Sequence, residues 1–363
     1  MNKEIQKLKI ALTTDCVLRC RHCRIDKEMG LDVSYEDCVS AVDVLLTAPG
    51  ELKRLELYGG EPFLRFDLMK DVTAYAVRKA AEQKKLLSLS VASNGIIINE
   101  EMLSFMRENR INLSLSVSGS KENHDCCRVF ADGSGSYDRL LGKIGLILRR
   151  MDPYDVVALE CVAPQGASGL YDDLLTLTKQ GFVVTNVECV HGMSWGKKEL
   201  GALEKSLAAF VEYLNGEIKK GVFIVPEPFI EFFRVTASGA AINCPLYRDF
   251  ELYPDGKYGF YPFCFVYYDE CKEKIWTGSA KDGLYPKYLK CIPGSEECKH
   301  CISDYYTIPG LFSGSVAYTL RTNILKKAFL EIMEKSRADA DFRMYVKRLA
   351  ILKSRQYADY SLK

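Results

Sequence analysis

Hydrophobic positions along the first two thirds of the chain follow two alternating periods. Short apolar runs rich in β-branched residues are each followed by a longer stretch with apolar residues at three-and-four spacing. Repeated strand–helix units of this kind predict a parallel sheet with right-handed crossovers, curved or closed into a barrel, with the chemistry at the carboxyl ends of the strands. The predicted strands cover residues 8–14, 54–59, 86–92, 111–117, 156–162 and 183–190, and the predicted helices cover 35–48, 67–83, 99–109, 137–151, 169–180 and 199–220.

The pattern changes after Gly221. The sequence becomes rich in aromatic residues, glycine and proline, and Pro254-Asp255-Gly256 predicts the turn of a short hairpin. Helical periodicity returns from about Val316 to the last residue. We therefore expect three parts, namely a barrel domain over residues 1–235, a small domain over 236–310 and a helical segment over 311–363.

Composition and charge bear on the partners and the compartment. The 363 residues contain 49 Lys and Arg against 48 Asp and Glu, so the overall charge predicts neither nucleic-acid nor membrane-surface binding. Neither a signal peptide nor an apolar run of about 18 residues is apparent, which predicts a cytoplasmic protein. Because thiols stay reduced there, the 14 cysteines favour metal ligation or redox chemistry over disulfides.

Three of these cysteines stand a few residues after the first predicted strand. Cys16, Cys20 and Cys23 have the spacing C-x3-C-x2-C in the stretch LTTDCVLRCRHCRI. With His22 they could form a Cys3His zinc knot, although one short loop would struggle to wrap four ligands tetrahedrally around one ion. The alternative is a [4Fe-4S] cluster held by three thiolates, which leaves one iron free for another ligand.

The spacing and the place of these cysteines resemble the radical S-adenosylmethionine (SAM) superfamily. In that family the amino and carboxylate groups of SAM bind the fourth iron, and an electron from the cluster cleaves SAM to methionine and a 5′-deoxyadenosyl radical. Further segments resemble the family's motifs in the same order along the chain: Gly59-Gly60-Glu61-Pro62 after the second strand, Ser93-Asn94-Gly95 after the third, and Ser116-Val117-Ser118-Gly119, His124-Asp125, Arg128 and Gly135-Ser136-Tyr137 after the fourth.

The resemblance implies how each segment would hold SAM. Two positions depart from the family's pattern, because His22 replaces the aromatic residue common before the third cysteine and Ser118 replaces an aspartate. The backbone of Gly59 and Gly60 would approach the methionine end of SAM, and the Glu61 carboxylate would accept a hydrogen bond from its ammonium group. Ser93, Asn94 and Ser116 would lie near the ribose. Arg128 would bind the SAM carboxylate.

A second group of cysteines lies in the predicted small domain. A CxxC turn supplies two metal ligands, and two further thiols can complete a zinc site or a cluster. The pattern C…PDG…YPxC…CxxC resembles the start of the SPASM extension of radical SAM enzymes, in its shortened "twitch" form because no cysteine follows Cys301. The resemblance implies one auxiliary [4Fe-4S] cluster. Its expected ligands are Cys244, Cys264, Cys298 and Cys301, and Cys271 or Cys291 could replace one of them.

The resemblance also implies the fold class and the type of reaction. The fold would be α/β, a partial (β/α)6 TIM-like barrel followed by a small twitch-type domain and C-terminal helices. We expect a maturase that forms a thioether or carbon–carbon crosslink in a ribosomally made peptide, with the auxiliary cluster accepting an electron. The alternative is a dehydrogenase of a small aminocyclitol or sugar alcohol. The intact cysteine and GGE motifs disfavour a non-catalytic binding protein, and a reductant such as flavodoxin or ferredoxin is implied.

The remaining features concern partners and other thiols. Residues 321–363 carry 11 Lys and Arg against 5 Asp and Glu, by default a solvated helix face and, as a hypothesis, a docking surface for an acidic leader peptide. No peptide-recognition domain is visible before the first strand, so a separate protein could recognise the leader instead. Arg128 beside Cys126 and Cys127 predicts a more reactive thiol there. Core packing is expected for Cys38, Cys161 and Cys189.

Overall fold

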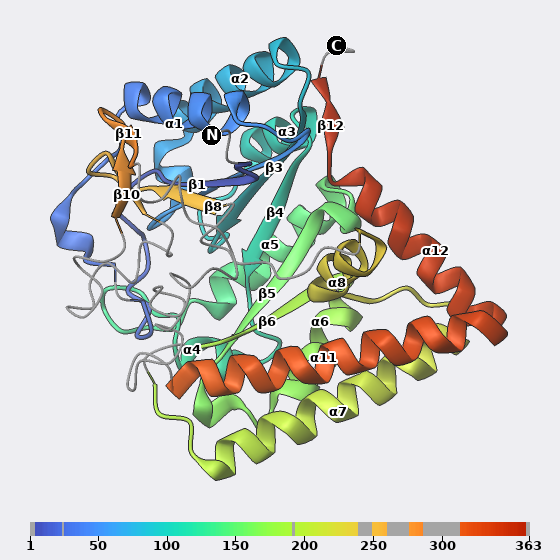
Figure 1. Ribbon diagram of the computed structural model, residues 1–363. Coiled ribbons are helices and arrows are strands. Elements are labelled where there is room, and N and C mark those ends of the chain that lie inside the picture. The colour runs from blue at the N-terminus through green and yellow to red at the C-terminus, as the bar shows by residue number, and fades with distance from the viewer. Residues whose placement is uncertain are drawn as a thin grey trace.

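The computed structural model describes residues 4–23, 25–190, 193–238, 249–259, 276–285 and 313–360. Its central feature is a sheet in which each strand pairs in parallel with the next strand of the chain (Figure 1). The six predicted strands are thereby confirmed as β1 (Lys7–Ala11), β2 (Leu52–Tyr58), β3 (Leu86–Ser93), β4 (Ile111–Ser116), β5 (Val156–Val162) and β6 (Val184–Cys189).

A helix follows each of these strands and returns the chain to the start of the next. Ser34 and Asn99 accept hydrogen bonds from backbone N–H groups in the first turns of two of these helices and so cap them. The predicted helices are confirmed, with ends that shift by two residues or fewer, as α1 (Tyr35–Thr47), α2 (Phe66–Glu82), α3 (Glu100–Glu108), α5 (Tyr137–Arg150), α6 (Leu170–Gln180) and α7 (Lys197–Lys219). Shorter elements in the loops are η1 (Lys27–Met29), η2 (Pro62–Arg65), α4 (Lys121–Asp125), η3 (Pro153–Asp155) and η4 (Pro164–Gly166).

Alternate residues of each strand point to opposite sides of the sheet. One set is apolar and buried against α1 and α2, as Leu8 on β1 and Leu57 on β2 illustrate. The other set is only half-buried and includes charged side chains such as Lys9 and Glu56. We call the side of β1 to β6 that carries this second set the inner face. The packing that holds the fold therefore lies on the helix side of the sheet.

The sheet continues past both β6 and β1. Next to β6 lies β7 (Val225–Pro226), which leads into α8 (Glu227–Ser238), a helix that the sequence pattern does not predict. Next to β1 lies β8 (Asp249–Leu252), which pairs in parallel with it, followed by β9 (Lys257–Gly259), β10 (Trp276–Ser279) and β11 (Gly283–Leu284). Among the described strands β7 and β11 form the two edges, so the barrel is partial, as expected.

The hairpin predicted at Pro254 to Gly256 is confirmed by the antiparallel pairing of β8 with β9. Gly256 sits in the turn with a φ of 78°, a left-handed conformation that favours glycine. These strands fall within the range 236–310, which was expected to form a separate small domain. Their pairing with β1 shows that this described part extends the barrel sheet.

Two long helices follow, α11 (Ser313–Ala338) and α12 (Ala340–Arg355), and a short strand, β12 (Ala358–Asp359), pairs with the start of β3. This confirms the predicted C-terminal helices. Figure 1 shows α11 lying beside α7, and the rings of Phe229 and Phe329 join α8 to α11 with centroids 5.5 Å apart. No helix in the described ranges is long and apolar enough to cross a membrane.

Candidate functional site

The loop after β1 carries Cys16, Cys20 and Cys23, all half-buried and free of disulfides. The Leu18 N–H donates to the Sγ of Cys16 over 3.4 Å, and Lys27 Nζ donates to the Sγ of Cys23 over 3.0 Å. Asn94 Nδ2, at the end of β3, reaches the Sγ of Cys16 over 3.5 Å. The three thiols thus stand at the carboxyl end of the sheet, and Cys16 and Cys23 have hydrogen-bond donors that stabilise thiolates.

Burial raises the pKa of Cys16 to about 12 and also raises the pKa of Cys20. Both thiols therefore hold their protons at neutral pH in the protein without a metal. Metal binding would displace those protons, as ligation by cysteine requires.

The zinc-knot alternative does not match the conformation of this loop. Across the described ranges, no three His, Cys, Asp or Glu side chains come close enough together to hold one metal ion. A tetrahedral zinc site needs all its ligands on a single ion, whereas in an iron–sulfur cluster each thiolate binds its own iron. The described conformation therefore does not bring Cys16, Cys20 and Cys23 together as ligands of one zinc ion.

The Gly59-Gly60-Glu61-Pro62 turn follows β2 and lies against the cysteine loop. Gly60 N–H donates to the carbonyl of Thr13 over 2.8 Å, and Glu61 N–H donates to that of Asp15 over 2.7 Å. A Cβ on Gly60 would stand 1.9 Å from the Asp15 carbonyl oxygen, so no larger residue fits. The glycines therefore allow two loops to come into close contact. This role of the glycines was not indicated by the sequence pattern.

Glu61 is fully buried, and its carboxylate joins the loops after β2 and β3. It accepts hydrogen bonds from Ser93 Oγ over 2.8 Å, Asn94 N–H over 2.9 Å and Phe63 N–H over 3.3 Å. Burial raises its pKa to about 7, although these three donors lower it. Both oxygens are occupied by protein donors, so contact with a SAM ammonium stays a prediction, while a positioning role is visible.

The run from Ser116 to Tyr137 forms one hydrogen-bonded unit after β4. His124 accepts from the Ser118 N–H at Nδ1 over 3.3 Å, and its Nε2 lies 3.0 Å from Ser136 Oγ. Arg19 N–H donates to the carbonyl of Val129 over 2.7 Å, which ties this unit to the cysteine loop. Ser116, half-buried at the end of β4, belongs to the same edge.

Arg128 is 5% exposed, and its Nη2 has no hydrogen-bond partner among the described residues. Nearby, His22 Nδ1 is buried and equally without one. A buried cation that lacks a partner is costly unless an anion joins it. The unsatisfied Nη2 of Arg128 therefore fits a ligand carboxylate, and the chain's residues fit the cluster and SAM that the motifs imply.

Glu160 on β5 places a buried carboxylate against the loop after β4. It accepts from the Gly119 N–H over 3.2 Å, and its pKa rises to about 8 through burial and through the neighbouring charge of Asp173. The one signal for it in the sequence is a glutamate within the apolar run VVALECV.

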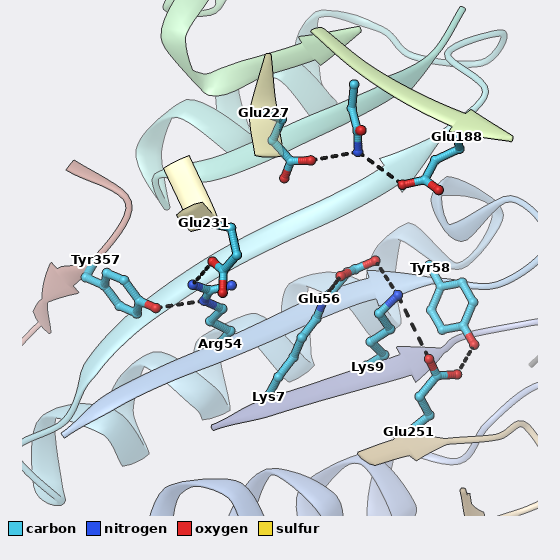
Figure 2. A network of polar contacts seen from close by, with 11 residues as sticks. Lys7, Lys9, Arg54, Glu56, Tyr58, Glu188, Glu227, Glu231, Glu251 and Tyr357 are labelled. Atoms are coloured by element: carbon cyan, nitrogen blue, oxygen red, sulfur yellow. Dashed lines mark hydrogen bonds and ion pairs between the residues drawn. The ribbon is translucent and has the colours of Figure 1, made fainter. Parts of the chain in front are cut away.

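The inner face carries a network of charged side chains that the sequence pattern did not single out (Figure 2). Lys7 and Lys9 lie 2.6 and 3.3 Å from the carboxylate of Glu56, and Lys9 lies 3.9 Å from that of Glu251. Tyr58 donates to Glu251. The signal available in the sequence was the alternation of charged and apolar residues in KLKI and RLELY.

The remaining cysteines differ in burial and in whether the structure describes them. Cys38 and Cys189 are buried, as expected for core thiols, whereas Cys161 is half-buried on the inner face. Cys126 Sγ donates to Cys127 Sγ over 3.5 Å, so the two thiols that precede Arg128 contact each other. The expected auxiliary ligands Cys244, Cys264, Cys298 and Cys301 lie outside the described residues, as do Cys271 and Cys291.

A partial parallel barrel with a three-cysteine loop, a glycine turn and a buried arginine at one edge defines the class of radical SAM domains. Residues 10–159 match the family model described as the Radical SAM superfamily, so the chain carries a radical SAM domain.

Similar curated proteins match only part of the chain. One is a "Cysteine-type anaerobic sulfatase-maturating enzyme" of Clostridium novyi, 25% identical over 43% of this chain and 44% of that protein. Another is a "GTP 3',8-cyclase" of a Synechocystis species, 30% identical over 32% of this chain and 34% of that protein. The chain thus spans less than half the length of these relatives.

Solved structures show the same fold over most of the chain. The protein described as "Native anSMEcpe with bound AdoMet and Cp18Cys peptide" has a TM-score of 0.67 at 16% identity, covering 91% of this chain and 99% of that one. Streptococcus suis SuiB bound to its precursor peptide SuiA has a TM-score of 0.52 at 13% identity, covering 86% and 71%. Because the identities are low, these likenesses concern the fold.

Proposed function

We propose that this protein is a radical SAM enzyme that oxidatively modifies a ribosomally made peptide. The observation that carries the proposal is the unsatisfied Nη2 of the buried Arg128 beside three half-buried thiols on the loop after β1. When bound, a [4Fe-4S] cluster and SAM supply a 5′-deoxyadenosyl radical able to take hydrogen from an unactivated C–H bond. Cys16, Cys20 and Cys23 would hold that cluster.

The chain's own residues orient SAM and keep water from it. Arg128 would bind the SAM carboxylate, since its Nη2 has no hydrogen-bond partner among the described residues. Glu61 would fix the loops after β2 and β3 through its three hydrogen bonds. The other residues proposed to line the SAM site are Gly59, Gly60, Ser93, Asn94 and Ser116.

A peptide is the proposed substrate class. A relative is named for sulfatase maturation, and structures with the same fold are described with peptides bound, which supports this choice. The bond formed would be a thioether or a carbon–carbon crosslink. Cys244, Cys264, Cys298 and Cys301 would hold an auxiliary [4Fe-4S] cluster that accepts the second electron of the oxidation. A flavodoxin or ferredoxin would supply the first electron, and the leader would bind the basic α11 and α12 or a separate protein.

The test is an anaerobic assay of the reconstituted full chain with SAM and dithionite, with candidate peptides and aminocyclitols offered separately. We expect 5′-deoxyadenosine together with a peptide that has lost two hydrogens. If only an aminocyclitol is oxidised, the proposed peptide maturase would be wrong and the dehydrogenase alternative would take its place. Absence of 5′-deoxyadenosine with every substrate, in protein that holds its iron, would contradict the proposed function.

A further inference from the structure

Glu188 is placed on the inner face at the carboxyl end of β6, close to the candidate SAM site. The register of β5 and β6 sets it opposite Cys161. Burial raises the pKa of Cys161, Arg128 lowers it and Glu188 raises it, so the two charged groups act on this thiol together. Glu188 therefore shares the end of the barrel with Arg128, where a substrate must lie to reach SAM.

The carboxylate of Glu188 is held at one oxygen. Its Oε1 accepts from Arg321 Nη2 and from Asn186 Nδ2, each over 3.3 Å. Arg321 is itself fixed, because it donates to the Val187 carbonyl over 2.7 Å and to Asn186 Oδ1 over 2.8 Å. Across the described ranges no donor reaches Glu188 Oε2, and 36% of the side chain is exposed. Glu188 thus offers an oriented carboxylate with one accessible oxygen.

The other carboxylates on or beside the inner face are less suited to take a proton from a substrate. Glu56 lies against two lysines, and Glu251 is buried and receives the hydroxyl of Tyr58. Glu231 pairs with Arg54, which Tyr357 ties to the opposite end of the barrel. The side-chain amide of Asn186 donates to both Glu188 and Glu227. Figure 2 shows these two carboxylates on opposite sides of that amide. Position and accessibility therefore single out Glu188.

We propose that Glu188 is the catalytic base that takes a proton from the substrate during its oxidation. The substrate carbon would lose a hydrogen atom to the 5′-deoxyadenosyl radical, giving 5′-deoxyadenosine. The neighbouring S–H, O–H or N–H group would lose its proton to Glu188 Oε2. An oxidised auxiliary [4Fe-4S] cluster, if Cys244, Cys264, Cys298 and Cys301 hold one, would take up one electron, and the carbon and the heteroatom would gain a bond. The inference rests on the proposed function, because it needs both the radical and that cluster.

The experiment uses the anaerobically reconstituted full chain and a cysteine-containing peptide deuterated at every carbon, so that a hydrogen atom taken from any carbon labels 5′-deoxyadenosine. The variant is Glu188→Gln, and the matched control is Glu231→Gln, whose carboxylate is equally exposed at 37% and lies 3.2 Å from an arginine. The readouts are deuterated 5′-deoxyadenosine and oxidised peptide, quantified in the same reaction. A role limited to folding or SAM binding would lower both together.

We expect Glu188→Gln to form deuterated 5′-deoxyadenosine within about threefold of the wild type, while oxidised peptide falls on the order of a hundredfold, the usual effect of removing a general base. Glu188→Asp should regain part of the oxidised peptide, and Glu231→Gln should leave the product ratio unchanged. Parallel loss of both products, or of neither, in Glu188→Gln would overturn the assignment. A wild-type enzyme that yields no deuterated 5′-deoxyadenosine would instead overturn the proposed function.

Discussion

The two faces of the same strands differ sharply in chemistry. On the helix side, residues such as Leu57 and Leu113 are buried in one continuous apolar core. On the inner side, their sequence neighbours Glu56 and Ser114 are half-buried and polar. A complete TIM barrel fills its interior with branched apolar side chains. Here a large apolar core lies on the helix side, whereas the inner face carries polar and charged side chains.

This division separates residues that hold the fold from residues that act on ligands. Substitutions on the helix side should therefore lower the free energy of unfolding and leave activity per folded molecule intact. Substitutions at the strand ends should do the reverse, and substitutions on the inner face should cost little stability. Four variants, taken from the largest expected effect to the smallest, test this division.

Cys16→Ala should abolish SAM cleavage while changing the free energy of unfolding of the metal-free protein little, because the thiol is only half-buried. The measurement is 5′-deoxyadenosine released per folded chain. Cys38→Ala, a buried thiol on α1, is the matched control and should keep its activity. A Cys16→Ala variant that still cleaves SAM would remove the basis of the functional assignment.

Gly60→Ala should lower SAM cleavage on the order of a hundredfold, because the loop after β2 would be forced away from the backbone of Asp15. Gly142→Ala is the control, since a Cβ there meets nothing within 4 Å. Both variants are compared by initial rates at saturating SAM. Equal rates for the two would show that the close contact of the loops does not matter to the site.

Leu113→Ala should destabilise the protein by about 2–5 kcal/mol, the range for emptying a buried leucine site. Its neighbour Ser114→Ala, on the inner face, should change stability by less than about 1 kcal/mol. Urea unfolding of the two variants under identical conditions measures the difference. Similar losses would mean that the inner face also carries packing energy, which would erase the contrast between the faces.

Glu251→Gln should have the smallest effect, confined to the pH dependence of stability. Burial raises the pKa of Glu251 to about 7 from 4.5. Because the folded state holds this proton more tightly than the unfolded state, the free energy of unfolding should fall as pH rises from about 4.5 to about 7. The variant should show a shallower fall than the wild type in urea unfolding at several pH values, and an identical slope would contradict the assignment.

Much of the fold follows from periodicity in the sequence. The strands and helices up to residue 219 have clean periods, so their positions were predicted within a few residues. Helix α8 was missed because its first residues, Glu227-Pro228-Phe229, continue an aromatic and proline-containing run. The pairing of β8 with β1 was missed because it joins strands more than 200 residues apart, which no local pattern encodes.

The site was predictable in part. Motif order located the loops that contain Cys16, Glu61 and Arg128, and the structure brings these loops together. The buried hydrogen bonds of Glu61 and the contribution of Glu160 depend on contacts between strands, so spacing could not reveal them. The auxiliary ligands from Cys244 to Cys301 stay a prediction.

The most direct measurement is electron–nuclear double resonance on the reduced cluster with SAM labelled at its amino nitrogen and carboxylate oxygen. Cys298→Ala in the same protein removes the expected auxiliary cluster, so that the signal reports the cluster of Cys16, Cys20 and Cys23. If one iron of that cluster is open to SAM, both labels should couple strongly to the electron spin. A spectrum that the labels leave unchanged, in protein that binds SAM, would contradict that claim.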